Sequence, residues 1–371
     1  MASLIRRLKG RFRRLSDPFV SKVSGGWRPG VRYVTEPADW VIDREGKALC
    51  NAINDQFPDT SVEMVESVKG LYNKVVHFGS VWVFVPNIHK VHPSNRVVLT
   101  FYHGNEGLDE VTRQAIDALR SNLQHLDKVV TASAMMEERL RSWGVDADML
   151  HRIEIGTDTS MFHPPGPGQR RDLRRRLGIP EDALCIGSFQ KDGLGWEDGD
   201  EPKLIKGPDI LVETLTRLAG RHRIHVLLIG PSRGYVKREL DRSGVAYTHL
   251  YEEDFTKLPT YYHCLDLYLV TAREEGGPKA IAESLASGVP LVSTRVGMAP
   301  DMVTDGVNGF LFDVEDTGGL VSAADRLLKD EALRSHFAAK GVEVARSLDI
   351  KLLSRKLYET VYEPLLRKGP P

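Results

Sequence analysis

The sequence predicts an α/β protein of two domains, each built on a parallel sheet covered by helices. The chain has 371 residues, more than a single hydrophobic core usually organises, so two domains are expected. From Val31 onward, strand-like and helix-like segments alternate. Strand segments such as HVLLIG and LDLYLV are almost continuously apolar, which is typical of parallel strands buried on both faces.

Composition and charge exclude several classes of protein. Hydrophobic residues make up 41% of the chain, charged residues 27%, and the formal net charge is -1, so no overall field favours nucleic acid as a partner. Cys50, Cys185 and Cys264 lack metal-ligand spacing, and we expect reduced thiols in a cytoplasmic protein. No apolar run is long enough to span a bilayer, since that takes about 18 residues.

The first segment, residues 1–28, is basic and amphipathic. Its apolar residues recur every three or four positions with arginine and lysine between them: Leu4, Ile5, Leu8, Phe12 and Leu15. This spacing predicts a helix over residues 4–15 that lies on an anionic membrane surface, which would place the protein peripherally on the inner face of a membrane. The alternative is a terminal helix that packs on its own domain or on nothing.

An N-terminal domain is expected over residues 29–163. Apolar and β-branched runs predict its strands: Val31–Thr35, Lys74–Phe78, Val81–Val85, Arg96–Tyr102, Lys128–Ala132 and His151–Ile155. Ala134–Trp143 is predicted as a helix that ends before Gly144. The run HPPGPG that follows is dense in helix and strand breakers, so residues 164–168 are predicted to be a linker.

A second domain is expected over residues 169–348. Its predicted strands are Ala183–Phe189, His225–Gly230, Tyr247–Tyr251, Leu265–Thr271, Leu291–Thr294 and Gly309–Asp313. Its predicted helices are 208–219, Tyr235–Ser243, Leu258–Cys264, Pro278–Ser287 and Thr317–Lys329. The first of them has a proline in its first turn and a glycine just past its end. Because ligands bind beyond the carboxyl ends of such strands, two sheets joined by a linker predict a cleft between domains.

The stretch REEGGPKAIAESLASGVP places two carboxylates around a helix start. Glu275 follows an apolar strand, and Gly276 and Gly277 let the backbone approach a ligand closely. The amides at the start of the next helix attract an anion such as a diphosphate. Glu283 lies about a turn and a half further on. One carboxylate on each side would hold the hydroxyls of a sugar and a ribose; the alternative is a solvated Glu275 and a Glu283 paired with a lysine.

The span Leu265–Phe312 resembles the family 4 glycosyltransferases. The resemblance rests on EGGPKAIAE, on SLASGVPLVSTRVG and on DGVNGFLF. It implies the GT-B fold, with two facing Rossmann-like domains and a cleft between them. It also implies a retaining reaction on a nucleotide-sugar donor, with no cofactor and no metal needed for the chemistry. In these relatives the first glutamate contacts the donor sugar and the second contacts the ribose, which gives Glu275 and Glu283 those roles.

Further donor residues follow from the same resemblance. Lys206 stands in a Lys-Gly element whose lysine neutralises the donor diphosphate. Relatives carry an arginine near the place of Ser188, and Lys191 is the candidate substitute. Pro278 replaces a glycine and removes an amide donor, so Lys279 is a candidate replacement. The catalytic and donor-binding candidates together are His103, Lys206, Glu275, Lys191, Gly276, Gly277, Lys279, Glu283 and Gly297.

The resemblance also marks residues of the first domain. His77 and His103 stand in the strand-end motifs VVHFGS and LTFYHGNE; His103 would contact the donor sugar near the reacting carbon, and His77 would lie on the acceptor side. Gly156 and Asp158, in IEIGTD, are further acceptor-side candidates. TEPADWVIDREG stands where relatives have a glycine-rich loop. Residues 349–371 are expected as helices that cross back to the N-terminal domain.

These patterns predict a hexosyltransferase-type enzyme. It would transfer a sugar from a nucleotide-diphosphate donor to a glycan or lipid-linked acceptor in cell-surface polysaccharide or glycolipid synthesis. The alternatives are a catalytically silent nucleotide-sugar-binding subunit and a sugar-nucleotide epimerase of the same fold. A dinucleotide dehydrogenase is excluded because no Gly-x-Gly-x-x-Gly follows a strand. The acidic stretch around Asp198 and Asp200 is expected to be a solvated loop rather than a metal site.

Overall fold

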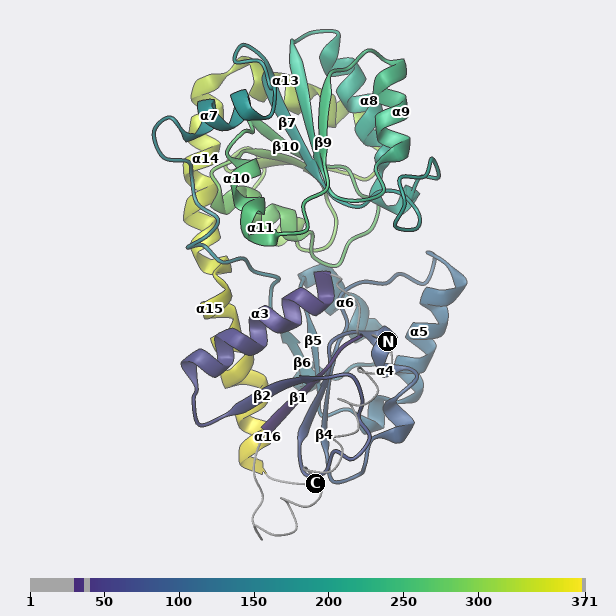
Figure 1. Ribbon diagram of the computed structural model, residues 1–371. Coiled ribbons are helices and arrows are strands. Elements are labelled where there is room, and N and C mark those ends of the chain that lie inside the picture. The colour runs from purple at the N-terminus through teal and green to yellow at the C-terminus, as the bar shows by residue number, and fades with distance from the viewer. Residues whose placement is uncertain (1–29, 37–40, 369–371) are drawn as a thin grey trace, which may run out of the picture. The chain divides into compact units, whose positions relative to one another are not determined.

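The structure is a computed structural model that describes residues 30–36 and 41–368 (Figure 1). The predicted amphipathic segment of residues 1–28 lies outside the described residues. The chain forms two compact units. Unit 1 comprises residues up to Thr131, Glu137–Ile153 and the segment from Ser354, and unit 2 comprises Ala132–Met136 and Glu154–Leu353. Within the described part, none of the helices has the length and apolar character needed to cross a membrane.

Unit 1 contains a six-stranded parallel sheet in the order β2-β1-β3-β4-β5-β6. Its strands are β1 (Gly30–Val34), β2 (Ser61–Val65), β3 (Val75–Phe78), β4 (Arg96–Thr100), β5 (Lys128–Thr131) and β6 (Leu150–Arg152). The helices that follow these strands are α3 (Val41–Gln56), α4 (Val81–Phe84), α5 (Glu110–Ser121) and α6 (Ala134–Ser142). The parallel pairing confirms the predicted sheet type.

The prediction of a strand at Val81–Val85 is wrong, because these residues form the short helix α4. Helical hydrogen bonds run from the Phe84 amide to the Ser80 carbonyl at 3.2 Å and from the Val85 amide to the Val81 carbonyl at 3.0 Å. Val81, Val83 and Phe84 are buried. An apolar run of five residues does not separate a strand from a buried helical turn by its pattern alone, and here the turn comes directly after β3.

Unit 2 contains the second six-stranded parallel sheet, in the order β12-β11-β10-β7-β8-β9. Its strands are β7 (Leu184–Phe189), β8 (Ile224–Ile229), β9 (Tyr247–Leu250), β10 (Leu267–Val270), β11 (Leu291–Thr294) and β12 (Gly309–Phe312). Its helices are α7 (Gln169–Arg176), α8 (Pro208–Ala219), α9 (Gly234–Arg242), α10 (Leu258–Tyr262), α11 (Lys279–Ala286), α12 (Ala299–Met302), α13 (Thr317–Lys329) and α14 (Glu331–Ala345).

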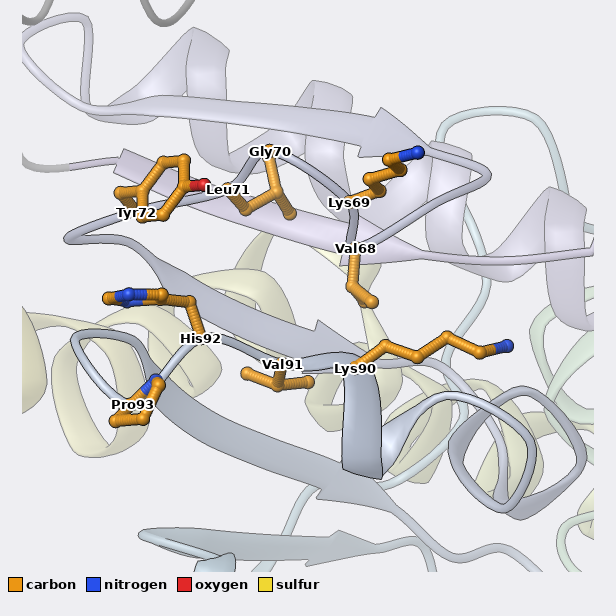
Figure 2. Close-up of a pocket in the computed structure, with 9 residues that line it drawn as sticks. All are labelled: Val68, Lys69, Gly70, Leu71, Tyr72, Lys90, Val91, His92 and Pro93. Atoms are coloured by element: carbon orange, nitrogen blue, oxygen red, sulfur yellow. The ribbon is translucent and has the colours of Figure 1, made fainter.

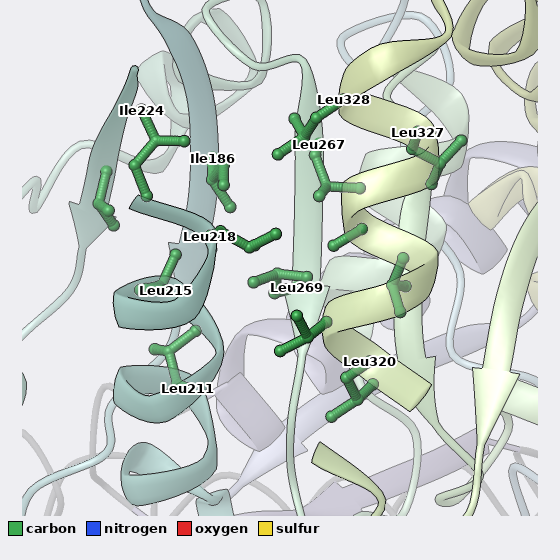
Figure 3. Packing of buried hydrophobic residues seen from close by; sticks show 14 of the residues in the cluster. Ile186, Leu211, Leu215, Leu218, Ile224, Leu267, Leu269, Leu320, Leu327 and Leu328 are labelled. Carbon is green, nitrogen blue, oxygen red and sulfur yellow. The ribbon is translucent and has the colours of Figure 1, made fainter. Parts of the chain in front are cut away.

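The core of unit 2 lies between its sheet and the helices α8 and α13, which pack against each other and onto the strands (Figure 3). Leu211, Leu215 and Leu218 follow the three- and four-residue spacing of a helix face, and all three are fully buried. Burial of each such side chain contributes about 1.5–3 kcal/mol. This packing fixes the strand ends that carry the loops described below.

The chain passes into unit 2 at residue 154, before the predicted linker of residues 164–168. The Thr157 amide binds the Leu348 carbonyl at 2.9 Å, and the Ile350 amide binds the Thr157 carbonyl at 2.9 Å. These bonds place residues 154–163 with unit 2, so the two compact units divide at Ile153 rather than at residues 164–168.

The C-terminal segment consists of α15 (Ile350–Leu357), a π-helical turn (Tyr358–Tyr362) and α16 (Glu363–Lys368). From Ser354 it contacts unit 1. Gln56 donates to the Ser354 hydroxyl at 2.9 Å, and the hydroxyls of Thr60 and Tyr358 are 2.9 Å apart. The described part of this segment from Ser354 onward is thereby part of unit 1.

Candidate functional site

The order of strands in unit 2 identifies one edge position as the place for a ligand. The chain builds outward from β7 through β8 and β9 on one side and through β10, β11 and β12 on the other. In open parallel sheets, ligands bind beyond the carboxyl ends of the strands where the order reverses. In unit 2 that position is the gap between the ends of β7 and β10, and the loops after these two strands define it.

The two loops are joined by hydrogen bonds. The Arg273 amide donates to the Ile205 carbonyl at 2.8 Å, and the Thr271 hydroxyl donates to the Gly207 carbonyl at 2.9 Å. Gly207 has a φ of 62°, in the left-handed region that favours glycine. A Cβ atom at this position would overlap the Thr271 carbonyl oxygen. The turn before α8 therefore requires glycine and fixes the position of the preceding lysine.

Lys206 and Glu275 form an ion pair at this position, across 69 residues of sequence. Lys206 is the last residue before the glycine that opens α8, and Glu275 follows β10. Their side chains are 24% and 15% exposed, so both are partly desolvated yet reachable by a ligand. The structure thus brings together two of the three predicted catalytic residues, Lys206 and Glu275. An ammonium suits a phosphate, and a carboxylate accepts hydrogen bonds from sugar hydroxyls.

The predicted glycines shape the loop that carries Glu275. Gly297 has a φ of 50°, and a Cβ there would lie 2.6 Å from the Gly276 carbonyl oxygen and 2.7 Å from that of Glu275. A Cβ on Gly277 would meet Ile155 at 2.8 Å. The loop that carries Glu275 therefore packs against Gly297 and Ile155 so closely that neither glycine position has room for a Cβ atom. It leads into α11, which begins at Lys279 with Pro278 as its N-cap residue, and the first amides of a helix lack partners within it.

Arg273 is a residue of this site that sequence reasoning missed. Its guanidinium donates to both carboxylate oxygens of Asp209, at 2.8 and 2.7 Å, and to the Leu204 carbonyl at 2.7 Å. It also pairs with Glu315. The hydrogen bond from Arg273 lowers the pKa of Asp209. Arg273 thereby ties the start of α8 to the loop after β10; its only sequence signal was its place two residues before Glu275.

Lys191 lies at the base of a surface hairpin formed by residues 192–203, which we call the hairpin. Gly193 and Pro202 pair as an antiparallel bridge, and the Leu194 amide donates to the Glu201 carbonyl at 3.0 Å. The Lys191 ammonium lies over the ring of Trp196, 4.2 Å from its centroid. Such a cation–π contact holds the ammonium on the hairpin side of the site.

The acidic residues of the hairpin bind the start of α9. Asp198 pairs with Lys237 and accepts from the Arg233 amide at 2.8 Å, and Asp200 pairs with Arg238 at 2.8 Å. The acidic stretch around Asp198 and Asp200 therefore holds the hairpin against the start of α9. Among the described residues, no group of three or more histidine, cysteine or acidic side chains is arranged to hold a metal ion.

Glu283 lies on the buried face of α11 and is 5% exposed. Its carboxylate accepts a hydrogen bond from the Tyr262 hydroxyl at 2.8 Å. Tyr262 is completely buried and stacks on Tyr268, with ring centroids 5.6 Å apart. Burial and the neighbouring Glu283 carboxylate raise the pKa of Tyr262. In this structure the side chain of Glu283 supports the aromatic layer beneath the site, and its contact with a ribose stays a prediction.

Comparison with known proteins identifies the domain. The family model described as Glycosyl transferases group 1 matches residues 201–330. This segment includes Lys206, Glu275, Glu283 and Gly297. Residues 201–330 are therefore similar to a group 1 glycosyltransferase domain.

Curated proteins that are similar to part of the chain are also named as glycosyltransferases. A D-inositol 3-phosphate glycosyltransferase of Xylanimonas cellulosilytica is 32% identical over 215 residues, which cover 55% of this chain and 48% of the relative. A GDP-mannose-dependent alpha-mannosyltransferase of Corynebacterium glutamicum is 30% identical over 234 residues, which cover 62% of this chain and 51% of the relative. The chain therefore spans about half the length of these relatives.

Solved structures establish the fold of this chain. Anabaena HepE in complex with UDP-glucose superposes with a TM-score of 0.72 at 16% identity, over 90% of this chain and 99% of that one. A sucrose-phosphate synthase from Thermosynechococcus elongatus gives a TM-score of 0.72 at 17% identity, over 91% and 100%. The two parallel six-stranded sheets and these neighbours confirm the predicted GT-B fold.

The predicted histidines lie in unit 1 and differ in their surroundings. His77 is 1% exposed, with Nδ1 2.6 Å from the Tyr362 hydroxyl and Nε2 2.7 Å from the Thr100 hydroxyl. Burial lowers the pKa of His77 to about 3. Both nitrogens are engaged inside the unit, so the geometry of His77 supports a structural role and not contact with an acceptor. His103 follows β4 in a loop and is partly buried.

Gly156 and Asp158, the other acceptor-side candidates, build a turn in unit 2. A Cβ on Gly156 would overlap the Leu348 carbonyl oxygen. The Asp158 carboxylate accepts from the amide of Ser160 at 2.9 Å and from its hydroxyl at 2.5 Å. The structure therefore gives both residues a local role in the chain that leads into unit 2.

Unit 1 contains a hollow of about 380 Å³ (Figure 2). It is lined by the loops before β3 and β4: Val68, Lys69, Gly70, Leu71, Tyr72, Lys90, Val91, His92 and Pro93. These loops lie at the amino ends of the strands, whereas ligands of parallel sheets bind at the carboxyl ends. The hollow is therefore not part of the candidate donor site.

Proposed function

We propose that the chain is a retaining glycosyltransferase that moves a sugar from a nucleotide-diphosphate donor to a glycan or lipid-linked acceptor. The observation that carries the proposal is the Lys206–Glu275 ion pair between the ends of β7 and β10. It places one cation and one hydroxyl-binding carboxylate where parallel sheets bind nucleotides. The relatives support the class of reaction, because they are named as glycosyltransferases.

The proposed chemistry depends on stabilising the leaving group. Negative charge develops on the departing nucleoside diphosphate as the bond to the sugar breaks. The Lys206 ammonium and the first amides of α8 and α11 would face that charge, and each preorganised donor of this kind is worth about 2.7–4 kcal/mol in the transition state. Glu275 would hold the sugar by its hydroxyls. In a retaining front-face reaction the donor phosphate accepts the proton of the attacking hydroxyl, so the proposal needs no cofactor and no metal.

The donor class is supported by the solved neighbours, one of which is described in complex with UDP-glucose. We extend to this chain only the class, a nucleotide-sugar, with a hexose as the transferred group. Cell-surface polysaccharide or glycolipid synthesis is the proposed setting, since one relative is a lipopolysaccharide core mannosyltransferase of Rhizobium meliloti.

The activity test is release of nucleoside diphosphate from UDP-, GDP-, ADP- and dTDP-sugars, with and without candidate acceptors. The wild-type chain should release nucleoside diphosphate from one of these donor classes. Lys206→Met and Glu275→Gln should each slow that release by about 10²-fold or more. Lys340→Met and Glu343→Gln break the ion pair on α14 instead and should leave the rate unchanged. Tight donor binding without release under every acceptor would show a silent binding subunit and refute the proposal.

Membrane association through residues 4–15 is the second part of the proposal. The test is sedimentation with vesicles of anionic lipid, because basic side chains are attracted to such a surface at about 1 kcal/mol each. The intact chain should sediment with anionic vesicles and not with neutral ones. Removal of residues 1–16 should abolish sedimentation, and equal binding of the shortened chain would refute this part.

A further inference from the structure

Lys203 lies beside the donor site although no sequence pattern pointed to it. Its amide donates to the Asp192 carbonyl at 2.7 Å, which closes the hairpin, and its carbonyl accepts from the Lys206 amide at 2.8 Å. The latter bond closes the turn of the 3-10 helix Leu204–Lys206. Lys203 is the residue before this short helix and Lys206 is its last residue, so the bond holds the two backbone positions next to each other.

The charges around Lys203 do not balance. Burial and the nearby ammonium groups of Lys206 and Lys191 lower the pKa of Lys203, and the Glu275 carboxylate opposes that shift. Lys203 is only partly exposed. Within the described residues the Lys203 ammonium makes no hydrogen bond or ion pair, and Glu275 is already bound to Lys206. The Lys203 ammonium thus lies near the ammonium group of Lys206 in a partly desolvated place where Glu275 is already paired, and this arrangement favours binding of an anion with about two negative charges.

We propose that Lys203 is a second phosphate-binding cation of the donor site, delivered by the hairpin. The inference rests on the proposed function, because the diphosphate of a nucleotide-sugar is a ligand with two negative charges. Lys206 would bind one phosphate from the helix side, and Lys203 would bind the diphosphate from the hairpin side. The role of the hairpin is then to place a cation that the strand end itself does not provide.

A buried ion pair locks the hairpin in place. Arg233 and Asp192 are both completely buried, and their side chains are 3.1 Å apart. The Arg233 guanidinium also donates to the carbonyls of Ser188 and Gln190, each at 2.8 Å. Arg233 therefore connects the end of β7 to the first residue of the hairpin, eleven positions before Lys203 in the sequence and one hydrogen bond away from it. In this arrangement Arg233 is a positioning residue that cannot reach the ligand.

The test compares Lys203→Met with Lys203→Arg and with Lys340→Met, a control on α14. Binding of UDP, GDP, ADP, dTDP and inorganic pyrophosphate to the intact protein is measured by calorimetry at low salt. Lys203→Met should weaken pyrophosphate and the preferred nucleotide by about tenfold or more, because a charge-assisted bond is lost. Lys203→Arg should stay near wild type, and Lys340→Met should bind as wild type. The melting temperature of each variant verifies that it folds.

The outcomes separate this inference from the proposed function. Nucleotide affinity that is equal in wild type and Lys203→Met would overturn the role of Lys203 and leave the glycosyltransferase proposal standing. Pyrophosphate binding that depends on Lys203, with no binding of any nucleotide, would support the anion site and refute the nucleotide-sugar donor. Absence of binding of every probe by the wild-type chain would overturn both.

Discussion

At the scale of single residues, His77 should control part of the pH dependence of stability. The folded pKa of about 3 lies below the ordinary value of about 6.5. Between these values the unfolded chain takes up a proton that the folded chain does not. The contribution of His77 to the free energy of unfolding is therefore fully present above pH 6.5. It is lost as the pH falls toward 3, at about 1.4 kcal/mol per pH unit.

The measurement is urea unfolding of the intact chain at several pH values between 7.5 and 5, followed by circular dichroism. His77→Gln should be less stable at pH 7.5 but should lose less stability on acidification than the wild type. His125→Gln replaces an exposed histidine of unit 1 and should keep the wild-type slope. An equal slope for wild type and His77→Gln would show that His77 is not the titrating group.

Glu283 allows a structural role to be separated from a ligand role. Glu283→Ala would leave the buried Tyr262 hydroxyl without its partner and should cost about 1–3 kcal/mol of stability. Glu283→Gln keeps an acceptor for that hydroxyl, so the chain should fold normally. If Glu283 also binds ribose, Glu283→Gln should weaken nucleotide binding by about tenfold, while Tyr262→Phe should not. Unchanged affinity in both variants would remove the ribose role.

Residues of the candidate site were predictable from sequence where their immediate neighbours mark the place. Lys206 precedes Gly-Pro and Glu275 precedes Gly-Gly, so both stand at a visible change from strand to helix. Lys203 and Arg233 have no such signal, because their positions beside the site depend on a hairpin that folds back at the end of β7. His77 shows the opposite case, in which a strand-end histidine turned toward the core of unit 1.

At the scale of elements, the turn before α8 should be the most sensitive to a single methyl group. Gly207→Ala would add a Cβ that overlaps the Thr271 carbonyl oxygen at a φ of 62°. We expect a loss of about 2–5 kcal/mol, since backbone strain and overpacking add. Lys206 would also be displaced, so nucleotide binding should weaken. The measurements are chemical unfolding and calorimetric titration.

Gly244→Ala is a matched control for that change. Gly244 has a φ of 66°, and nothing lies within 4 Å of the Cβ it would gain. This variant should lose only about 1–2 kcal/mol of stability, which is the strain of a left-handed conformation in a residue with a Cβ atom. It should bind nucleotide as the wild type does. Equal losses in the two variants would mean that the contact with Thr271 does not hold the turn.

Strands and helices were predictable from sequence where a residue that breaks or caps an element marks its start. Leu291–Thr294 and Thr317–Lys329 have the predicted bounds, because Pro290 and Asp316 precede them. The helix α3 was not predicted, since Gly46 in its middle argues against a helix. A Cβ on Gly46 would lie 2.5 Å from the Tyr33 ring, so the glycine serves a close contact between α3 and β1 that only the folded chain shows.

At the scale of the whole molecule, ligand binding should stabilise the two units unequally. Lys206 and Glu275 both belong to unit 2. A ligand at a hundred times its dissociation constant adds about 2.7 kcal/mol to the state that binds it. Hydrogen exchange of the intact chain with saturating nucleoside diphosphate should therefore slow most at residues 190–209 and 274–281. The strands β1 to β4 of unit 1 should change less.

The uncharged nucleoside and Lys206→Met are the controls for this exchange experiment. The nucleoside lacks the phosphates that the lysines would bind, so it should give little protection at residues 203–207. Lys206→Met should lose most of the protection that the wild type gains from the diphosphate. Protection centred on the strand ends of unit 1, with none near Lys206, would place the nucleotide in the other unit and contradict the assignment of the donor site, since a bound anion must slow exchange at the amides that hold it.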